Sequence, residues 1–194
     1  MLTSETTRLW LENFAQLIEA NKAYLSELDT PIGDADHGNN MARGMAALTE
    51  ALQAKPELDV ASILKTSAMA LISNVGGASG PVYGPAFLEM AKAAKNSDDL
   101  PTLLDAALAG VIKRGGAQVG DKTMVDAWTP LVQAVHDGTL SQAAIDEAVA
   151  TTKPLIAKKG RAAYLGERAI GHLDPGAQST GYLFQALLET EGIL

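Results

Sequence analysis

The sequence predicts an all-α protein, a barrel or bundle of eight antiparallel amphipathic helices. The first observation is composition: the 194 residues include 58 Ala and Leu but only 18 Val and Ile, and the first pair favours helix while the second favours strand. The second is spacing, because apolar residues recur at steps of three and four, and we find no alternating run of four or more residues. A length of 194 residues suits one domain with a buried core, spanning 1–194. Short connections should make neighbouring helices antiparallel.

The apolar stripes place the helices in order along the chain. The first stripe runs from Leu9 to Ile18 and the second from Met41 to Leu52. Asp59 is a typical N-cap residue, so a third helix is expected to begin just after it. The other five helices are expected over 82–94, 101–114, 122–137, 141–158 and 179–191.

Charge and residue usage exclude several classes of protein. A net charge of −8 with 5% aromatic residues argues against nucleic-acid binding, which needs clustered Lys and Arg. The absence of cysteine excludes disulfides, thiolate metal sites and cysteine nucleophiles. The uncharged run 66–88 contains Asn, Pro and Gly, so it is not expected to span a membrane. Glu5 and Glu12 stand where a signal peptide would be basic and then apolar, so we expect a soluble, cytoplasmic protein.

Four loops between the helices are unusually rich in glycine and polar residues. They cover 30–40, 73–84, 113–123 and 158–180, after the first, third, fifth and seventh helices. In an up-and-down bundle these loops share one end, which favours a functional site there. Glycine also caps helix C-termini, as Gly138 is expected to do, but capping does not explain the paired glycines at 76–77 and 115–116.

The first of these loops contains three carboxylates, Asp29, Asp34 and Asp36, within eight residues. Aspartate is common in turns and helix caps. Three like charges so close nevertheless repel one another, and a divalent cation offsets that repulsion. Oxygen ligands point to Mg²⁺, Mn²⁺ or Ca²⁺. The spacing does not fit an EF-hand, because Met45 occupies the position of its last glutamate.

The same loops have the features of a phosphate site. Gly38, Asn39 and Asn40 open the second helix, whose N-terminus favours an anion, and the glycine run at 76–80 offers further backbone amides. Lys122 and Arg161 could neutralise phosphate or simply face solvent. The sequence does not match the P-loop motif, because Asp121 stands between Gly120 and Lys122. It also contains no Rossmann fingerprint. The histidines are expected to be loop donors or exposed side chains, although a phosphohistidine is conceivable at His37 or His172.

Four long strings, TPIGDADHGNNMARGM, GGASGPVYG, GDKTM and KGRAAYLGERAIGHLDPGA, resemble the nucleotide-binding L subunit of dihydroxyacetone (glycerone) kinase. The resemblance covers the chain from about 28 to the last helix. It implies a barrel of eight helices, ADP or ATP bound in the loops at one end, and two Mg²⁺ held by Asp29, Asp34 and Asp36. The positions that match the nucleotide contacts of that family are His37, Gly38, Asn39, Asn40, Ala78, Ser79, Gly115, Met124, Arg161, Asp174, Pro175 and Gly176.

The resemblance also implies partners. In the phosphotransferase-system type, L is a separate subunit that keeps its ADP, a K subunit holds dihydroxyacetone, and a phosphohistidine on an M subunit rephosphorylates the nucleotide. A chain that contains L alone fits this type better than the fused, ATP-dependent kinases. The alternatives are an L-type domain of an ATP-dependent glycerone or fatty acid kinase, and a nucleotide-loaded co-regulator of a transcription factor. Tyr83 and Arg168 are expected to contact the K subunit.

Overall fold

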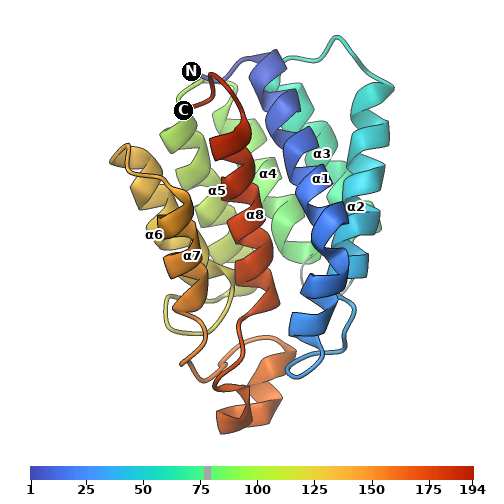
Figure 1. The fold of residues 1–194 in the computed structure, drawn as a ribbon. Helices are drawn as coiled ribbons and strands as arrows, with labels where there is room; N and C mark the ends of the chain where they lie inside the picture. The colour runs from blue at the N-terminus through green and yellow to red at the C-terminus, as the bar shows by residue number, and fades with distance from the viewer. Residues whose placement is uncertain (77–79) are drawn as a thin grey trace.

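The computed structural model describes residues 1–76 and 80–194, and over these residues the chain is helical and contains no strand (Figure 1). In the same ranges it forms eight α-helices and one 3₁₀ segment, which confirms the all-α prediction. The elements are α1 (Ser4–Asp29), α2 (His37–Gln53), α3 (Val60–Asn74), α4 (Gly80–Ala93), α5 (Leu100–Gly115), α6 (Met124–His136), α7 (Gln142–Ala150), η1 (Arg161–Ala169) and α8 (Pro175–Glu189).

The helices close into a ring around one apolar core. Each α-helix packs against the next one along the chain, and α8 returns to pack against α1. The indole of Trp10 on α1 donates a 3.0 Å hydrogen bond to the carbonyl of Leu183 on α8, and the ring of Trp128 on α6 meets Phe184 edge-on at 5.3 Å. Figure 1 shows both chain termini at one end of the ring and η1 at the other.

Side-chain caps fix where several helices begin. Asp59 caps α3 as predicted, accepting a hydrogen bond from the amide of Ser62 at 2.7 Å. Asp174 caps α8 in the same way through Ala177, and Pro175 takes the first helical position, where a missing N–H costs nothing. The predicted start of this helix at 179 is therefore four residues too late.

The predicted helix 141–158 is wrong in its second half, because α7 ends at Ala150. The hydroxyls of Thr151 and Thr152 donate to the carbonyls of Ala148 and Val149, which competes with continuation of the helix. Pro154 then disfavours helical geometry at the residue before it and removes a donor. The chain leaves the ring at this point and crosses its end as η1.

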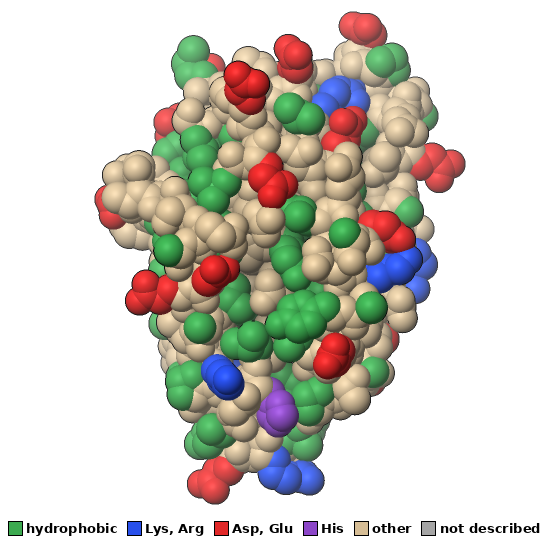
Figure 2. Space-filling view, viewed as in Figure 1, with side chains coloured by type: hydrophobic (Ala, Val, Ile, Leu, Met, Phe, Trp, Pro, Cys, Tyr) green, Lys and Arg blue, Asp and Glu red, His purple; other side chains and the backbone are tan. Residues whose placement is uncertain are grey.

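None of the described helices combines the length and the apolar character needed to cross a membrane. In the view of Figure 2, acidic side chains are spread over the face, interspersed with basic and apolar ones.

Candidate functional site

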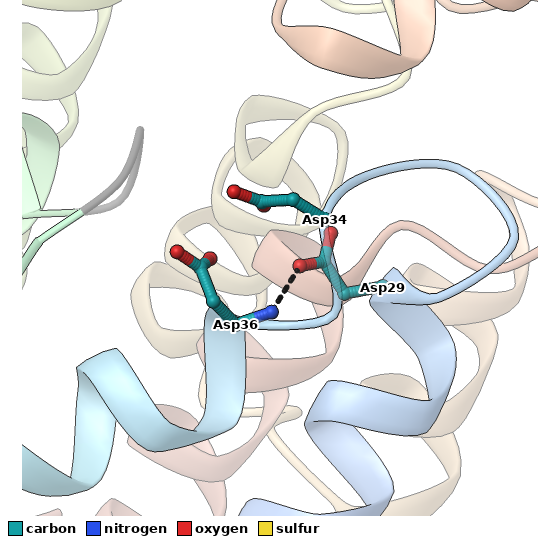
Figure 3. A group of neighbouring side chains, drawn as sticks. All are labelled: Asp29, Asp34 and Asp36. Carbon is teal, nitrogen blue, oxygen red and sulfur yellow. Dashed lines mark hydrogen bonds between the residues drawn. The ribbon is translucent and has the colours of Figure 1, made fainter.

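The three predicted carboxylates meet in the loop between α1 and α2. Asp29 is the last residue of α1, and Asp34 and Asp36 follow in the loop, with ligand oxygens that all lie within 4.8 Å of one another. Figure 3 shows the three side chains converging on one small volume. This spacing and the oxygen-only donor set fit a divalent cation such as Mg²⁺.

Asp29 also builds the loop that holds the other two carboxylates. Its Oδ2 accepts the backbone amide of Asp36 at 3.0 Å (Figure 3) and the backbone amide of His37 at 3.2 Å. Gly33 curls back so closely that a Cβ there would lie 1.9 Å from the Asp29 carboxylate, so no larger residue fits without moving it. The loop geometry thus depends on the carboxylate of Asp29.

The electrostatics of the loop favour a bound cation. The pKa of Asp34 is raised, first by desolvation and then by the hydrogen bond and charge of Asp36. Arg161 from η1 opposes this shift and forms an ion pair with Asp34. A cation would remove the remaining repulsion between carboxylates.

The N-terminus of α2 lies beside this cluster. Its N-cap residue, Asp36, makes no side-chain hydrogen bond to the helix, and the buried Asn40 lines the same pocket as the carboxylates. Gly38 permits a close crossing, since a Cβ there would lie 1.8 Å from the carbonyl of Lys22 on α1. Asn39, between Gly38 and Asn40 in the sequence, is exposed.

His37 is a buried structural donor or acceptor and not an exposed loop side chain. Its Nε2 lies 3.0 Å from the hydroxyl of Ser179 on α8, and that hydroxyl lies 2.9 Å from the phenol of Tyr83 on α4. Burial lowers the pKa of His37 to about 4. Tyr83 is fully buried, so the expectation that it contacts a partner is wrong.

The second glycine loop is described only in part. Gly76 lines the pocket, and Arg43 supports it by donating to the carbonyl of Asn74 and to Asn40. The candidate contacts Ala78 and Ser79 lie outside the described residues.

The third loop contributes Gly115 and Met124 to the pocket wall, together with Lys122. Lys122 is neither an open phosphate ligand nor a surface cation, because its ammonium group donates to the carbonyls of Thr152 at 2.7 Å and His172 at 2.6 Å. Burial lowers the pKa of Lys122, while the carboxylates of Asp174 and Asp126 oppose the shift.

The fourth segment closes the pocket. It brings Arg161 from η1 and Pro175 and Gly176 from the start of α8. Asp174, which caps α8, also lines the pocket, and burial raises its pKa to about 7. Segments that follow α1, α3, α5 and α7 therefore meet at one end of the ring, as the spacing of the loops predicts.

These segments enclose a pocket of about 440 Å³. That volume lies within the range of small-molecule and cofactor sites. The carboxylates occupy one side, and Arg114, Lys159 and Arg161 add positive charge to the wall. A pocket with a cation site and basic side chains suits a polyphosphate carried by a metal ion.

Sequence reasoning missed the buried, supporting roles of several residues around this pocket, including two that it had named in other roles. Lys122, Tyr83, Ser179 and Asp126 are all buried, and polar residues are seldom buried without partners. The one available signal was the capping box of α6, in which Asp126 accepts the amide of Thr123.

A pocket with a carboxylate cluster and basic side chains lies at one end of an eight-helix ring, and comparisons with known proteins identify the class of protein that has it. Residues 31–189 match the DAK2 domain. The chain is 52% identical over 189 residues to the PTS-dependent dihydroxyacetone kinase, ADP-binding subunit DhaL, of Lactococcus lactis, which covers 97% of this chain and 98% of that one. It is 40% identical to the PEP-dependent dihydroxyacetone kinase, ADP-binding subunit DhaL, of Escherichia coli, covering 92% of each chain. This protein therefore belongs to the DAK2 domain family.

A solved structure shares the fold. The dihydroxyacetone kinase of C. freundii in complex with AMP-PNP and Mg²⁺ superposes with a TM-score of 0.73 and 26% sequence identity. The match covers 96% of this chain and 33% of that one.

Proposed function

We propose that this chain is the ADP-binding L subunit of a phosphotransferase-dependent dihydroxyacetone kinase, a single domain spanning 1–194. The observation that carries the proposal is the pocket itself, in which three aspartates and a basic wall meet at one end of the ring. Support comes from relatives similar over nearly their whole length whose names specify an ADP-binding subunit. A cytoplasmic location is part of the same proposal.

The proposed ligands are ADP or ATP, tightly bound, with two Mg²⁺ held by Asp29, Asp34 and Asp36. Bound Mg²⁺ supplies positive charge that neutralises the phosphate oxygens during transfer. His37, Gly38, Asn39 and Asn40 would position the phosphates through the first turn of α2. The other proposed nucleotide contacts are Ala78, Ser79, Gly115, Met124, Arg161, Asp174, Pro175 and Gly176.

The proposed reaction is in-line transfer of the terminal phosphoryl group to dihydroxyacetone. This chain holds the phosphates in position, and Arg161 stabilises the negative charge that they carry into the transition state. A K subunit would hold the acceptor, and a phosphohistidine on an M subunit would rephosphorylate the bound ADP. We assign no general base to this chain.

Mass spectrometry under native conditions tests the proposal directly. Protein purified gently without added nucleotide should carry ADP, and unfolding followed by dialysis and refolding should remove it. Calorimetry on the stripped protein should then detect ADP binding that depends on Mg²⁺. A chain that neither retains nor rebinds ADP would overturn the assignment. Binding of ADP together with transfer to a fatty acid on a lipid-binding partner would instead favour the fatty acid kinase alternative.

A further inference from the structure

The segment 153–172, named here the strap, leaves the ring after α7, crosses the pocket as η1, and returns before α8. Its apolar support is small and separate from the main core. Ala157, Ala162 and Ala169 form a cluster with Ile32 of the carboxylate loop, and Leu165 packs against them. Few apolar contacts leave a segment dependent on its polar ties.

Polar ties hold the strap in its middle, where the amide of Lys158 donates to the carbonyl of Asp121 at 3.0 Å, and at its two ends. The amide of Gly171 donates to the carbonyl of Lys153 at 2.8 Å, and the amide of Asp174 donates to the hydroxyl of Thr152 at 3.0 Å. The ammonium group of Lys122 lies between these ends and donates to the carbonyls of Thr152 and His172 at 2.7 and 2.6 Å, with a third contact of 3.5 Å to Lys153. One cation thus joins the point where the strap departs to the point where it returns.

The loop that carries Lys122 is itself fixed to the ring. Asp126 on α6 accepts the amides of Gly120 at 2.6 Å and Thr123 at 2.8 Å, and Asp121 accepts the amide of Gln118 at 3.0 Å. Lys122 has a φ of +60°, in the left-handed region that side chains other than glycine and asparagine seldom occupy. An unusual backbone conformation held by its surroundings directs a buried ammonium group at the base of the strap.

We infer that Lys122 is a positioning residue for the nucleotide site, which holds the strap so that Arg161 reaches the pocket. Arg161 forms an ion pair with Asp34, and both residues line the pocket. Lys122 lines the pocket, but its ammonium group donates to backbone carbonyls, so we expect it to act through the strap and not by binding phosphate. Hydrogen bonds to charged groups are stronger than neutral ones, which suits an ammonium group for this task.

The affinity part of this inference rests on the proposed binding of ADP, but the strap itself can be observed without nucleotide. Lys122→Met removes the donors and keeps an unbranched side chain that is one atom shorter. In the nucleotide-free protein, hydrogen exchange of the amides of Gly171 and Asp174 should accelerate at least about tenfold, while amides in the middle of α1 keep their rates. Lys153→Met is the matched control, because it removes an exposed charge from the same strap.

Coupling to Arg161 separates positioning from a general structural role. Lys122→Met should weaken ADP binding about tenfold, and Arg161→Gln should weaken it by a comparable factor. If Lys122 acts through Arg161, the double variant should lose clearly less than the product of the two factors. Full multiplication of the losses, or unchanged strap exchange in Lys122→Met, would overturn the inference. Failure of wild-type protein to bind ADP would refute the proposed function and leave the exchange result standing.

The absence of cysteine in the chain permits a rescue experiment. Lys122→Cys, alkylated with 2-bromoethylamine while unfolded and then refolded, restores an ammonium group at nearly the length of lysine. This protein should recover slow strap exchange and ADP affinity, whereas alkylation with iodoacetamide should not. Recovery with both reagents would refute a role for the charge. A Lys122→Met chain that does not fold at all would also contradict the inference, since it would make Lys122 a support of the whole ring.

Discussion

Asp29 supports the backbone of the carboxylate loop, whereas Asp34 and Asp36 do not support it in this way. Asp34 and Asp36 carry their side chains into the shared volume, and neither caps the following helix with its carboxylate. Asp29 accepts two backbone amides in addition to its place in the cluster. The proposed metal-binding contribution of the loop can therefore be separated from its structural contribution by mutation.

Asp34→Asn or Asp36→Asn should abolish phosphoryl transfer while leaving the melting temperature nearly unchanged. Each substitution removes the charge of a proposed metal ligand at an exposed or half-buried position that supports little of the core. Asp29→Ala should in addition lower the free energy of unfolding by about 1 kcal/mol, the usual loss when a side chain that accepts helix-end amides is removed. Transfer assays at limiting Mg²⁺ and thermal melts measure both effects, with the exposed Asp146→Asn as control. Wild-type activity in either Asn variant would refute the metal assignment.

At the scale of elements, the N-termini of α2 and α8 bring two titrating groups into the interior. Burial raises the pKa of Asp174 to about 7, so the folded state binds a proton that the unfolded state has released. The contribution of this carboxyl to stability therefore falls as pH rises from about 4 to about 7. His37 has the opposite sign, because its pKa of about 4 makes stability fall as pH drops below its unfolded value.

Asp174→Asn should remove the first of these effects and keep the cap of α8, since an amide oxygen also accepts the amide of Ala177. The free energy of unfolding is measured with denaturant in EDTA. The difference between the variant and wild type should shift in favour of the variant as pH rises from 4.5 to 7.5. The matched control is Asp59→Asn, because Asp59 caps α3 at an exposed position. Parallel curves of unfolding free energy against pH for Asp174→Asn and wild type would contradict a raised pKa of Asp174.

The elements also show what a single sequence can predict. Periodic apolar stripes and the Asp59 cap placed most helices within a few residues, because those signals are local. The end of α7 and the existence of η1 depend on side-chain hydrogen bonds at Thr151 and Thr152 and on contacts with distant loops. The shared end of the glycine loops followed from topology alone. The buried roles of Lys122 and Tyr83 did not, since burial of these polar side chains is decided by partners up to 97 residues away.

At the scale of the molecule, ADP with Mg²⁺ should raise the melting temperature strongly, and EDTA should reverse much of the gain. The pocket joins segments from four inter-helix connections, and the strap has little apolar support of its own. A ligand that binds only the folded state stabilises it by about 4 kcal/mol at a thousandfold excess over its dissociation constant. Differential scanning calorimetry of stripped protein with ADP, Mg²⁺, both or neither tests this. An unchanged melting temperature with both present would contradict it.

We expect this chain to hold the nucleotide while a partner subunit holds the acceptor. Loaded with ATP and Mg²⁺, the chain alone should not phosphorylate free dihydroxyacetone at a useful rate. A triose has few atoms, and the binding energy available per atom has a ceiling, so non-covalent contacts with the triose alone give weak binding. Its hydroxyl must nevertheless be held in line with the terminal phosphate, which accounts for several kcal/mol of the rate enhancement.

Among the described residues, two groups that could capture the carbonyl of the acceptor are already engaged. Lys122 is committed to backbone carbonyls, and His37 is buried against Ser179, so neither is placed to capture a carbonyl group. The partner should dock at the end of the ring where the strap crosses, because the phosphates are proposed to lie there. Tyr164 on the strap is 90% exposed and replaces the buried Tyr83 as a candidate contact beside Arg168.

Reconstitution decides the question. Nucleotide-loaded protein is incubated with dihydroxyacetone, with and without the K subunit, and triose phosphate is followed over time. Product should form rapidly only with K, and Tyr164→Ala should slow this reaction without altering ADP affinity, because Tyr164 is exposed on the strap and does not line the pocket. The exposed Tyr24→Ala on α1 is the control. Rapid product formation without K would place the acceptor site on this chain, and the proposed division would then have to be abandoned.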